Sequence, residues 1–258
     1  MNLPALFLAT GVVTVIGMVL LWLLSLALRD ASIVDPFWGT GFTIVAWTAF
    51  TVAGDRGAHD LLLAVLVTIW GSRLSGYLLW RSRGKAEDYR YQAFRRRWGS
   101  RFWFVSFFTV FLLQGALLWI VSLPVQVAML APGRVGVLTM IGTAIWGVGL
   151  VFESIGDWQL ARFKADADNR GEVMDRGLWR YTRHPNYFGD FVVWWGLYLV
   201  SLGTIEPWWT FFGPALMSFL LIRVSGVVML ERTIGRRRPE YAAYAQRTSP
   251  FFPRRPRT

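Results

Sequence analysis

The chain has 258 residues, a formal net charge of +11 and no cysteine. Because there is no thiol and there are only two histidines, disulfides, thiolate zinc sites, iron–sulfur clusters and a cysteine nucleophile are excluded, and no metal site is expected. More than half of the residues are hydrophobic, and 15 Trp and 19 Phe are typical of helices that end at lipid–water interfaces. We therefore interpret the charge as the cytoplasmic bias of a membrane protein, with or without a phosphate-bearing ligand, and expect no nucleic-acid partner.

Seven apolar runs are candidates to cross a bilayer as helices, which takes about 20 residues each. In chain order they are Ala5–Leu28, Pro36–Ala53, Leu61–Trp80, Phe102–Leu130, Val135–Ile155, Tyr187–Gly203 and Trp208–Leu230. The first run is too long for a signal-peptide core and follows no basic residue, so we expect a retained span. Pro124 predicts a kink in the fourth run. We expect an all-α integral membrane protein, a single seven-span bundle over residues 1–258.

Basic residues gather in three segments, namely Arg81–Arg101, Arg162–Arg183 and the tail from Arg232 onward. The other connections carry almost no positive charge. With seven spans, all three basic segments fall on one side of the membrane. The positive-inside rule therefore predicts an outside N-terminus and a cytoplasmic C-terminus.

Charged residues within or beside the predicted spans indicate function, because charge is costly there. They are Asp35, Arg73, Glu153, Asp157, Asp190 and Arg223. Under the predicted topology, all of them lie toward the cytoplasm. They either pair with one another, as Asp190 and Arg73 could, or form a polar site, and their gathering on one side favours the site.

The segment Glu153–Asp190 has the highest density of polar residues. Glu153, Asp157 and Lys164 recur at helical spacing and so share a face. A cationic and aromatic patch follows, made of Arg176, Arg180, Tyr181, Arg183 and His184. Cations at helix ends bind phosphates, which indicates a nucleotide. No Gly-x-Gly-x-x-Gly follows a strand, so a Rossmann cofactor site is excluded.

Several motifs resemble the steroid 5-alpha-reductase family in its bacterial DUF1295 branch. They are SIVDPFWG (Ser32–Gly39), GKAEDYRY (Gly84–Tyr91), FLLQG (Phe111–Gly115), RYTRHPNYFGD (Arg180–Asp190) and the closing ERTIGRRRPEYAAYAQRTSPFFP. The resemblance implies a seven-helix bundle in a bacterial inner membrane, with NADPH enclosed from the cytoplasmic side. It also implies reduction of the Δ4 carbon–carbon double bond of a 3-oxo-steroid, or of a similar enone lipid, to the 5-alpha product. We expect no obligate protein partner.

The resemblance also assigns cofactor residues. The family's contacts match Glu153, Asp157, Lys164, Asn186 and Asp190, and the Arg-Gly-Arg loop of its eukaryotic members resembles Arg83-Gly84-Lys85. The full set expected to bind the cofactor is Arg73, Arg83, Lys85, Glu153, Asp157, Lys164, Tyr181, Arg183, His184, Asn186, Asp190 and Arg223.

Two residues are expected to be catalytic. The eukaryotic members polarise the substrate ketone with a Glu–Tyr pair, and the matching positions here are Asp35 and Trp70. Trp70 can donate a hydrogen bond but not a proton. A carboxyl in an apolar site can keep its proton, so we expect Asp35 to act protonated, or else a water or Tyr77 to supply the proton.

Two other functions stay open. A methyltransferase of the isoprenylcysteine or phospholipid type, using S-adenosylmethionine, shares the Arg-His-Pro-x-Tyr element and the basic tail, but it does not need the Asp35 motif. A transporter or lipid-binding protein should show discontinuous helices or inverted repeats, and the sequence shows neither.

Overall fold

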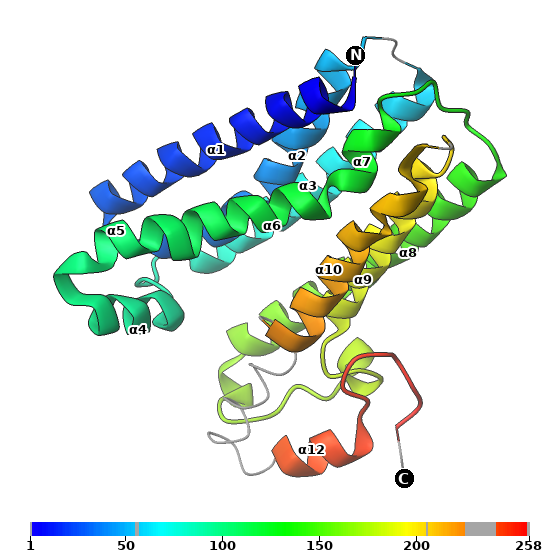
Figure 1. Ribbon diagram of the computed structural model, residues 1–258. Helices are drawn as coiled ribbons and strands as arrows, with labels where there is room; N and C mark the ends of the chain where they lie inside the picture. The colour runs from blue at the N-terminus through cyan, green and yellow to red at the C-terminus, as the bar shows by residue number, and fades with distance from the viewer. Residues whose placement is uncertain (1, 55–56, 205, 225–240, 257–258) are drawn as a thin grey trace. The chain divides into compact units, whose positions relative to one another are not determined.

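The computed structural model describes residues 2–54, 57–204, 206–224 and 241–256 (Figure 1). The chain divides into two compact units. Unit 1 comprises Met1–Thr139 and Ser201–Gly213, and unit 2 comprises Met140–Val200 and Pro214–Thr258. Within the described residues every element is helical, and one isolated parallel bridge joins Thr182 to Ser249. The expectation of one functional domain stays a prediction.

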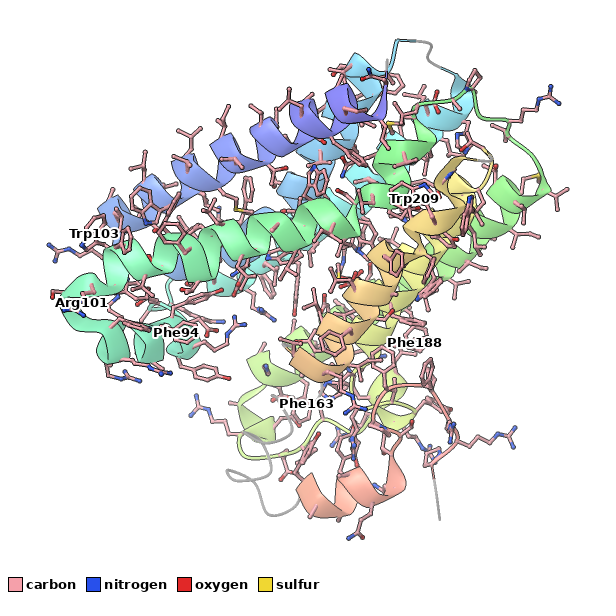
Figure 2. The ribbon with its side chains drawn as sticks, viewed as in Figure 1. Phe94, Arg101, Trp103, Phe163, Phe188 and Trp209 are labelled. Atoms are coloured by element: carbon pink, nitrogen blue, oxygen red, sulfur yellow. The ribbon has the colours of Figure 1, made fainter. Side chains whose placement is uncertain are left out.

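Unit 1 contains three long helices and a broken fourth. They are α1 (Leu3–Leu28), α2 (Val34–Val52), α3 (Ala58–Ser82) and the succession α5 (Phe102–Ser106), η3 (Phe107–Leu112), α6 (Leu113–Val121) and α7 (Leu123–Ala128). The short η1 (Ala31–Ile33) precedes α2, α4 (Tyr89–Trp98) and η2 (Gly99–Arg101) precede α5, and η6 (Glu206–Phe211) also belongs to this unit. Large apolar side chains project outward along α1, as Figure 2 shows, and Leu8 is 69% exposed, which suits a lipid-facing helix.

The helices α2 and α3 pack at glycines. A Cβ added at Gly39 would overlap the carbonyl oxygen of Gly71, and one added at Gly71 would overlap that of Gly39. The Ser75 hydroxyl donates to the Pro36 carbonyl at 2.7 Å and accepts from the Thr40 amide at 2.9 Å. The first turn of α2 is therefore held directly against α3.

The kink predicted from Pro124 is confirmed. Helix α6 ends at Val121, Ser122 has ψ near −2°, and α7 begins with Pro124 in its first turn. Just beyond the kink, the fully buried Gln126 accepts from Thr10 of α1 at 2.7 Å and donates to Ser122 at 2.7 Å. This satisfied polar cluster joins α1 to the kinked helix.

Unit 2 is built on two helices, α8 (Val137–Ala165) and α9 (Pro185–Ser201), which pack through glycines at seven-residue spacing. Gly142, Gly149 and Gly156 of α8 face the backbone of α9, and Gly189 and Gly196 of α9 face that of α8. The remaining elements are η4 (Ala167–Asn169), η5 (Gly177–Arg180), α10 (Phe212–Phe219), η7 (Leu220–Val224) and α12 (Tyr241–Arg247).

Four helices among the described residues are long and apolar enough to cross a membrane. They are Leu3–Leu28, Ala58–Ser82, Tyr89–Val121 and Val137–Ala165. The chain is therefore a multi-pass membrane protein by helix length and hydropathy. Helices α2 and α9 occupy the second and sixth predicted runs, and the seventh is helical to Val224, beyond which it lies outside the described residues. Seven spans remain a prediction.

Candidate functional site

A hydrogen-bonded network surrounds Asp35, in the first turn of α2. Its Oδ2 accepts from an Arg90 guanidinium nitrogen at 2.5 Å, and its Oδ1 accepts from the Tyr91 hydroxyl at 2.7 Å. Arg90 and Tyr91 open α4, where the Asp88 side chain caps the helix by accepting from the Arg90 amide at 2.9 Å. Both carboxylate oxygens of Asp35 are therefore acceptors. Their donors, Arg90 and Tyr91, lie in the first turn of α4, so the starts of α2 and α4 are joined here.

The network continues through two further side chains. Gln114 of α6 donates to the Tyr91 oxygen at 3.3 Å, and its own Oε1 accepts from the Trp38 indole at 2.6 Å. Trp38 lies about one turn after Asp35 on α2, so the hydrogen bonds run from α2 through Tyr91 and Gln114 and return to α2. These residues belong to three of the motifs noted above, SIVDPFWG, GKAEDYRY and FLLQG. Three separate stretches of sequence thus converge on one polar cluster, which we call the Asp35 network.

The loop before α4 holds this network in place. Glu87 accepts from the Ala31 amide at 2.8 Å and from Arg95 through both of its oxygens, at 2.8 and 3.0 Å. Burial acts to raise the pKa of Glu87, but the hydrogen bonds from Arg95 and Ala31 outweigh it and lower the pKa below its usual value. The pKa of Asp88 is also lowered, since burial is outweighed by the hydrogen bonds and charge of Arg90. The loop is therefore clamped to η1.

Trp70 and Tyr77 were also predicted to act with Asp35. Trp70 is fully buried in α3, and its ring centroid is 5.5 Å from that of Phe42 on α2. Tyr77, the other proposed proton source, lies below the guanidinium groups of Arg73 and Arg81, each 5.6 Å from its ring centroid. The hydroxyl that hydrogen-bonds Asp35 belongs to Tyr91.

Tyr91, Arg90 and Gln114 were absent from the site expected from sequence. The available signal was their place within motifs, since Arg90 and Tyr91 close GKAEDYRY and Gln114 is the polar residue of FLLQG. A glutamine in the middle of an apolar run is a polar group that needs a partner in a membrane protein.

In unit 2, two predicted carboxyl groups are buried on one face of α8. Glu153 is 3% exposed and Asp157 is 4% exposed. The side-chain amide of Asn186 on α9 donates to the Asp157 carboxylate at 3.1 Å, and Gly189 lets the α9 backbone approach Glu153. The structure thus brings together three residues that the sequence singled out. Asp190, half-buried, lies one turn after Asn186 on the same helix.

The other predicted cofactor residues of unit 2 are either buried or exposed. Arg183 is buried and donates to the Ala245 carbonyl at 2.7 Å, and the buried His184 stacks on Tyr187 with ring centroids 5.7 Å apart. Tyr181, Lys164 and Arg223 are exposed.

The expected cofactor residues are divided between the units. Arg73, Arg83 and Lys85 lie in unit 1 and the other nine lie in unit 2. Arg83 and Lys85 are exposed and flank Gly84, whose φ of +69° turns the chain after α3. Within the described residues there is no group of three or more His, Asp or Glu side chains that could hold a metal ion.

These features define an all-helical, multi-pass membrane protein with polar clusters at helix ends. The chain belongs to the family described as "Protein of unknown function (DUF1295)", whose model matches residues 21–248.

Two relatives come from Schizosaccharomyces pombe. "Uncharacterized protein C594.04c" is 26% identical over 91% of this chain and 76% of its own length. "Uncharacterized protein C9.08c" is 29% identical over 34% of this chain and 33% of its own length. No solved structure matches.

Proposed function

We propose that the protein is an NADPH-dependent membrane reductase of the steroid 5-alpha-reductase type. It reduces the carbon–carbon double bond of a 3-oxo-Δ4-steroid or a similar enone lipid. The observation that carries the proposal is the Asp35–Tyr91 hydrogen bond, because it forms a carboxylate–tyrosine pair of the kind that polarises the ketone in that family. We also propose the seven-span topology, with a cytoplasmic C-terminus in a bacterial inner membrane.

The residues fit a phosphate-bearing dinucleotide by their chemistry. Within unit 2, the Asp157–Asn186 pair offers acceptors and donors suited to ribose hydroxyls or a carboxamide, and the exposed Lys164 suits a phosphate group. When bound, NADPH supplies the hydride. The cations exceed what a pyrophosphate alone requires, so NADPH should bind more tightly than NADH.

In enone reduction, negative charge builds on the ketone oxygen, and a donor already in position stabilises it by about 3–4 kcal/mol. We assign that donor to the Tyr91 hydroxyl, whose hydrogen points to Asp35 in the structure and would turn to the ketone oxygen when the substrate binds. It is a better proton source than the indole of Trp70. Both Asp35 oxygens already accept hydrogen bonds, so we assign Asp35 to orienting Tyr91 rather than to acting as a protonated donor. Gln114 donates to the Tyr91 oxygen and so helps to fix the position of the hydroxyl.

A methyltransferase using S-adenosylmethionine is the alternative, since Arg183–Tyr187 reads Arg-His-Pro-Asn-Tyr. The nucleotide that co-purifies with the detergent-solubilised protein separates the two. We expect NADP(H), identified by mass spectrometry and confirmed by tighter binding of added NADPH than of NADH. Co-purified S-adenosylmethionine, or equal binding of NADPH and NADH, would contradict the proposal.

A further inference from the structure

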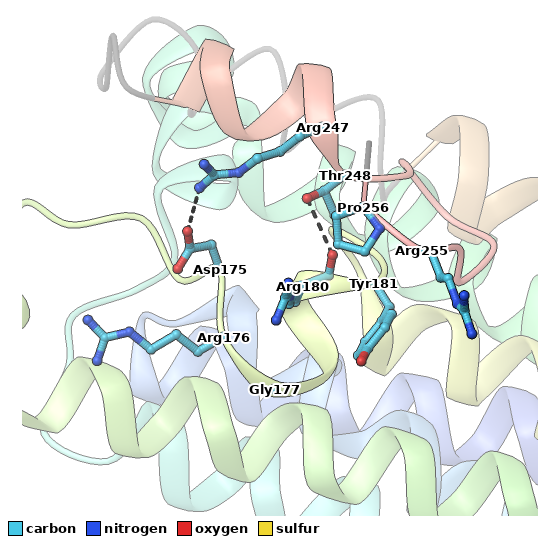
Figure 3. A pocket seen from close by; sticks show the side chains of 9 residues that line it. All are labelled: Asp175, Arg176, Gly177, Arg180, Tyr181, Arg247, Thr248, Arg255 and Pro256. Carbon is cyan, nitrogen blue, oxygen red and sulfur yellow. Dashed lines mark hydrogen bonds and ion pairs between the residues drawn. The ribbon is translucent and has the colours of Figure 1, made fainter. Parts of the chain in front are cut away.

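A pocket of about 800 Å³ lies within unit 2, between η5 and residues 247–256, which we call the C-terminal segment (Figure 3). Its lining residues are Asp175, Arg176, Gly177, Arg180, Tyr181, Arg247, Thr248, Arg255 and Pro256. We call it the arginine pocket, because four of these nine residues are arginines. It contains three residues of the cationic and aromatic patch noted in the sequence, Arg176, Arg180 and Tyr181, and of these only Tyr181 is among the residues expected to bind the cofactor.

The walls of the arginine pocket are tied together by hydrogen bonds. The Arg183 amide donates to the Ser249 carbonyl at 2.9 Å, and the Arg254 amide donates to the Tyr181 carbonyl at 3.0 Å. The Tyr244 hydroxyl also donates to the Trp179 carbonyl at 2.5 Å. These hydrogen bonds therefore hold Arg247 and Arg255 beside Arg176 and Arg180.

The charges of the pocket are not balanced. Arg247 pairs with Asp175 at 2.5 Å. Within the described part of the chain, the guanidinium groups of Arg176, Arg180 and Arg255 form no hydrogen bond or ion pair. Like charges held together repel one another, and an anion relieves the repulsion. Guanidinium groups bind phosphate oxygens in pairs, so a phosphate ester is the fitting anion.

The position of η5 along α8 indicates where the pocket meets the membrane. The Trp179 indole donates to the Gly156 carbonyl at 3.0 Å, and the Leu178 amide donates to Gln159 at 2.9 Å. At about 1.5 Å per residue, Gly156 lies about 28 Å beyond the start of α8 at Val137. The hydrocarbon core of a bilayer is about 30 Å thick, which puts η5 at headgroup level if the core begins near Val137.

Exposed aromatic side chains support this depth. Tyr181 lines the pocket and is 41% exposed, and Phe252, close by on the C-terminal segment, is 49% exposed. Phe252 also packs edge-on against Phe188 in the first turn of α9, with ring centroids 6.2 Å apart. Aromatic side chains gather at the interface between lipid and water.

We propose that the arginine pocket binds the phosphate headgroup of an anionic phospholipid. The site is separate from the Asp35 network and does not depend on the proposed reductase activity. Its position at the end of the membrane-crossing part of α8 selects a lipid over a free nucleotide, because a lipid phosphate is held at that depth by its own acyl chains.

The test is native mass spectrometry of the full chain with equal amounts of added phosphatidylglycerol and phosphatidylcholine. The pocket variant carries Arg180→Gln and Arg255→Gln, both at exposed positions. The matched control carries Arg96→Gln and Arg97→Gln, which remove the same charge from exposed positions of α4. Thermal unfolding of both variants serves as the control for correct folding.

We expect the wild type and the control to retain phosphatidylglycerol preferentially, and the pocket variant to lose that preference about ten-fold or more, because charge-assisted hydrogen bonds are lost. An unchanged preference in the pocket variant, or an equal loss in the control, would overturn the proposal. NADPH affinity is measured in parallel. A pocket variant that keeps its lipid preference and loses NADPH binding would assign the pocket to the nucleotide and also overturn it.

Discussion

The Asp35 network and the arginine pocket hold their charges in opposite ways. In the network, the Arg90 guanidinium donates to both Asp35 and Asp88, at 2.5 and 2.8 Å. In the pocket, three of the four guanidinium groups have no partner within the described part of the chain. A group whose partners are supplied by the protein is fixed in position, whereas a group without a partner is available to a ligand.

The side chains of the Asp35 network are also less exposed to solvent than the paired arginine of the pocket. The Asp35 and Arg90 side chains are 26% and 32% exposed, while that of Arg247, the one paired arginine of the pocket, is 50% exposed. Partly buried ion pairs are screened less by solvent than exposed ones, so the network resists rearrangement more strongly. We therefore assign chemistry to the network and binding to the pocket.

The sharpest test of this comparison is Tyr91→Phe, which removes the hydroxyl between Asp35 and Gln114. We expect the rate of the reduction step to fall about 100-fold or more, as for loss of a general acid, with nucleotide affinity unchanged. Single-turnover kinetics with an NADPH-loaded enzyme measure it. Tyr89→Phe is the control, because Tyr89 is a neighbouring but exposed tyrosine. A wild-type rate in Tyr91→Phe would mean that the network has only a structural role.

A second test separates orientation from stability at Asp35. Asp35→Ala removes the acceptor of the Tyr91 hydrogen bond, and we expect a loss of about 100-fold in the same step. Asp35→Asn keeps an amide oxygen that can accept from Tyr91, so it should retain part of the rate. If Asp35 only stabilises the start of α2, Asp35→Ala would cost about 1 kcal/mol of stability and leave the rate intact.

The third test asks how closely the network depends on the packing beneath it. Gly39→Ala places a Cβ against the Gly71 carbonyl, and overpacking of this kind costs about 1–3 kcal/mol. Thermal unfolding in detergent should show the loss. Gly76→Ala on α3 is the matched control, because nothing lies within 4 Å of its added Cβ, and it should stabilise by about 0.5–1 kcal/mol. Equal effects in the two variants would mean that α2 and α3 do not pack as described.

The smallest effect is expected at the Glu87 clamp. The folded-state pKa of Glu87 is lowered from 4.5, so its contribution to stability is present above pH 4.5 and is lost as the pH falls through the folded-state pKa. Glu87→Gln should therefore lower Tm slightly at neutral pH and show a shallower decline of Tm below pH 4.5 than the wild type. A parallel decline in both proteins would remove Glu87 as the titrating group.

The sequence predicts much of the helical framework. The first predicted span, Ala5–Leu28, lies within α1, and the kink at Pro124 follows from the missing amide of proline. The convergence of Asp157 and Asn186 was expected from a resemblance, and the structure shows their hydrogen bond. Hydrophobic periodicity and the interruption of helices by proline are local properties, so a single stretch of sequence is enough to predict them.

The partners within each site were not predictable in the same way. Asp35 and Tyr91 are 56 residues apart, and Asp175 and Arg247 are 72 residues apart. Their contacts depend on the clamp between Glu87 and Ala31 and on the hydrogen bonds that fold the C-terminal segment back onto η5. The resemblance directed attention to Trp70, because it compares positions along the chain and carries no information about the Tyr91 hydroxyl that contacts Asp35.

The central claim is that this protein transfers hydride from a nicotinamide to an enone while the Asp35 network holds the ketone oxygen. The most direct measurement uses NADPH deuterated at the transferring position and a 3-oxo-Δ4-steroid, with the product analysed by mass spectrometry and NMR. We predict one deuterium at the β-carbon of the former enone with the wild type, and little product with Tyr91→Phe while the nucleotide stays bound. A product without deuterium, or methyl transfer from S-adenosylmethionine in place of reduction, would contradict the account.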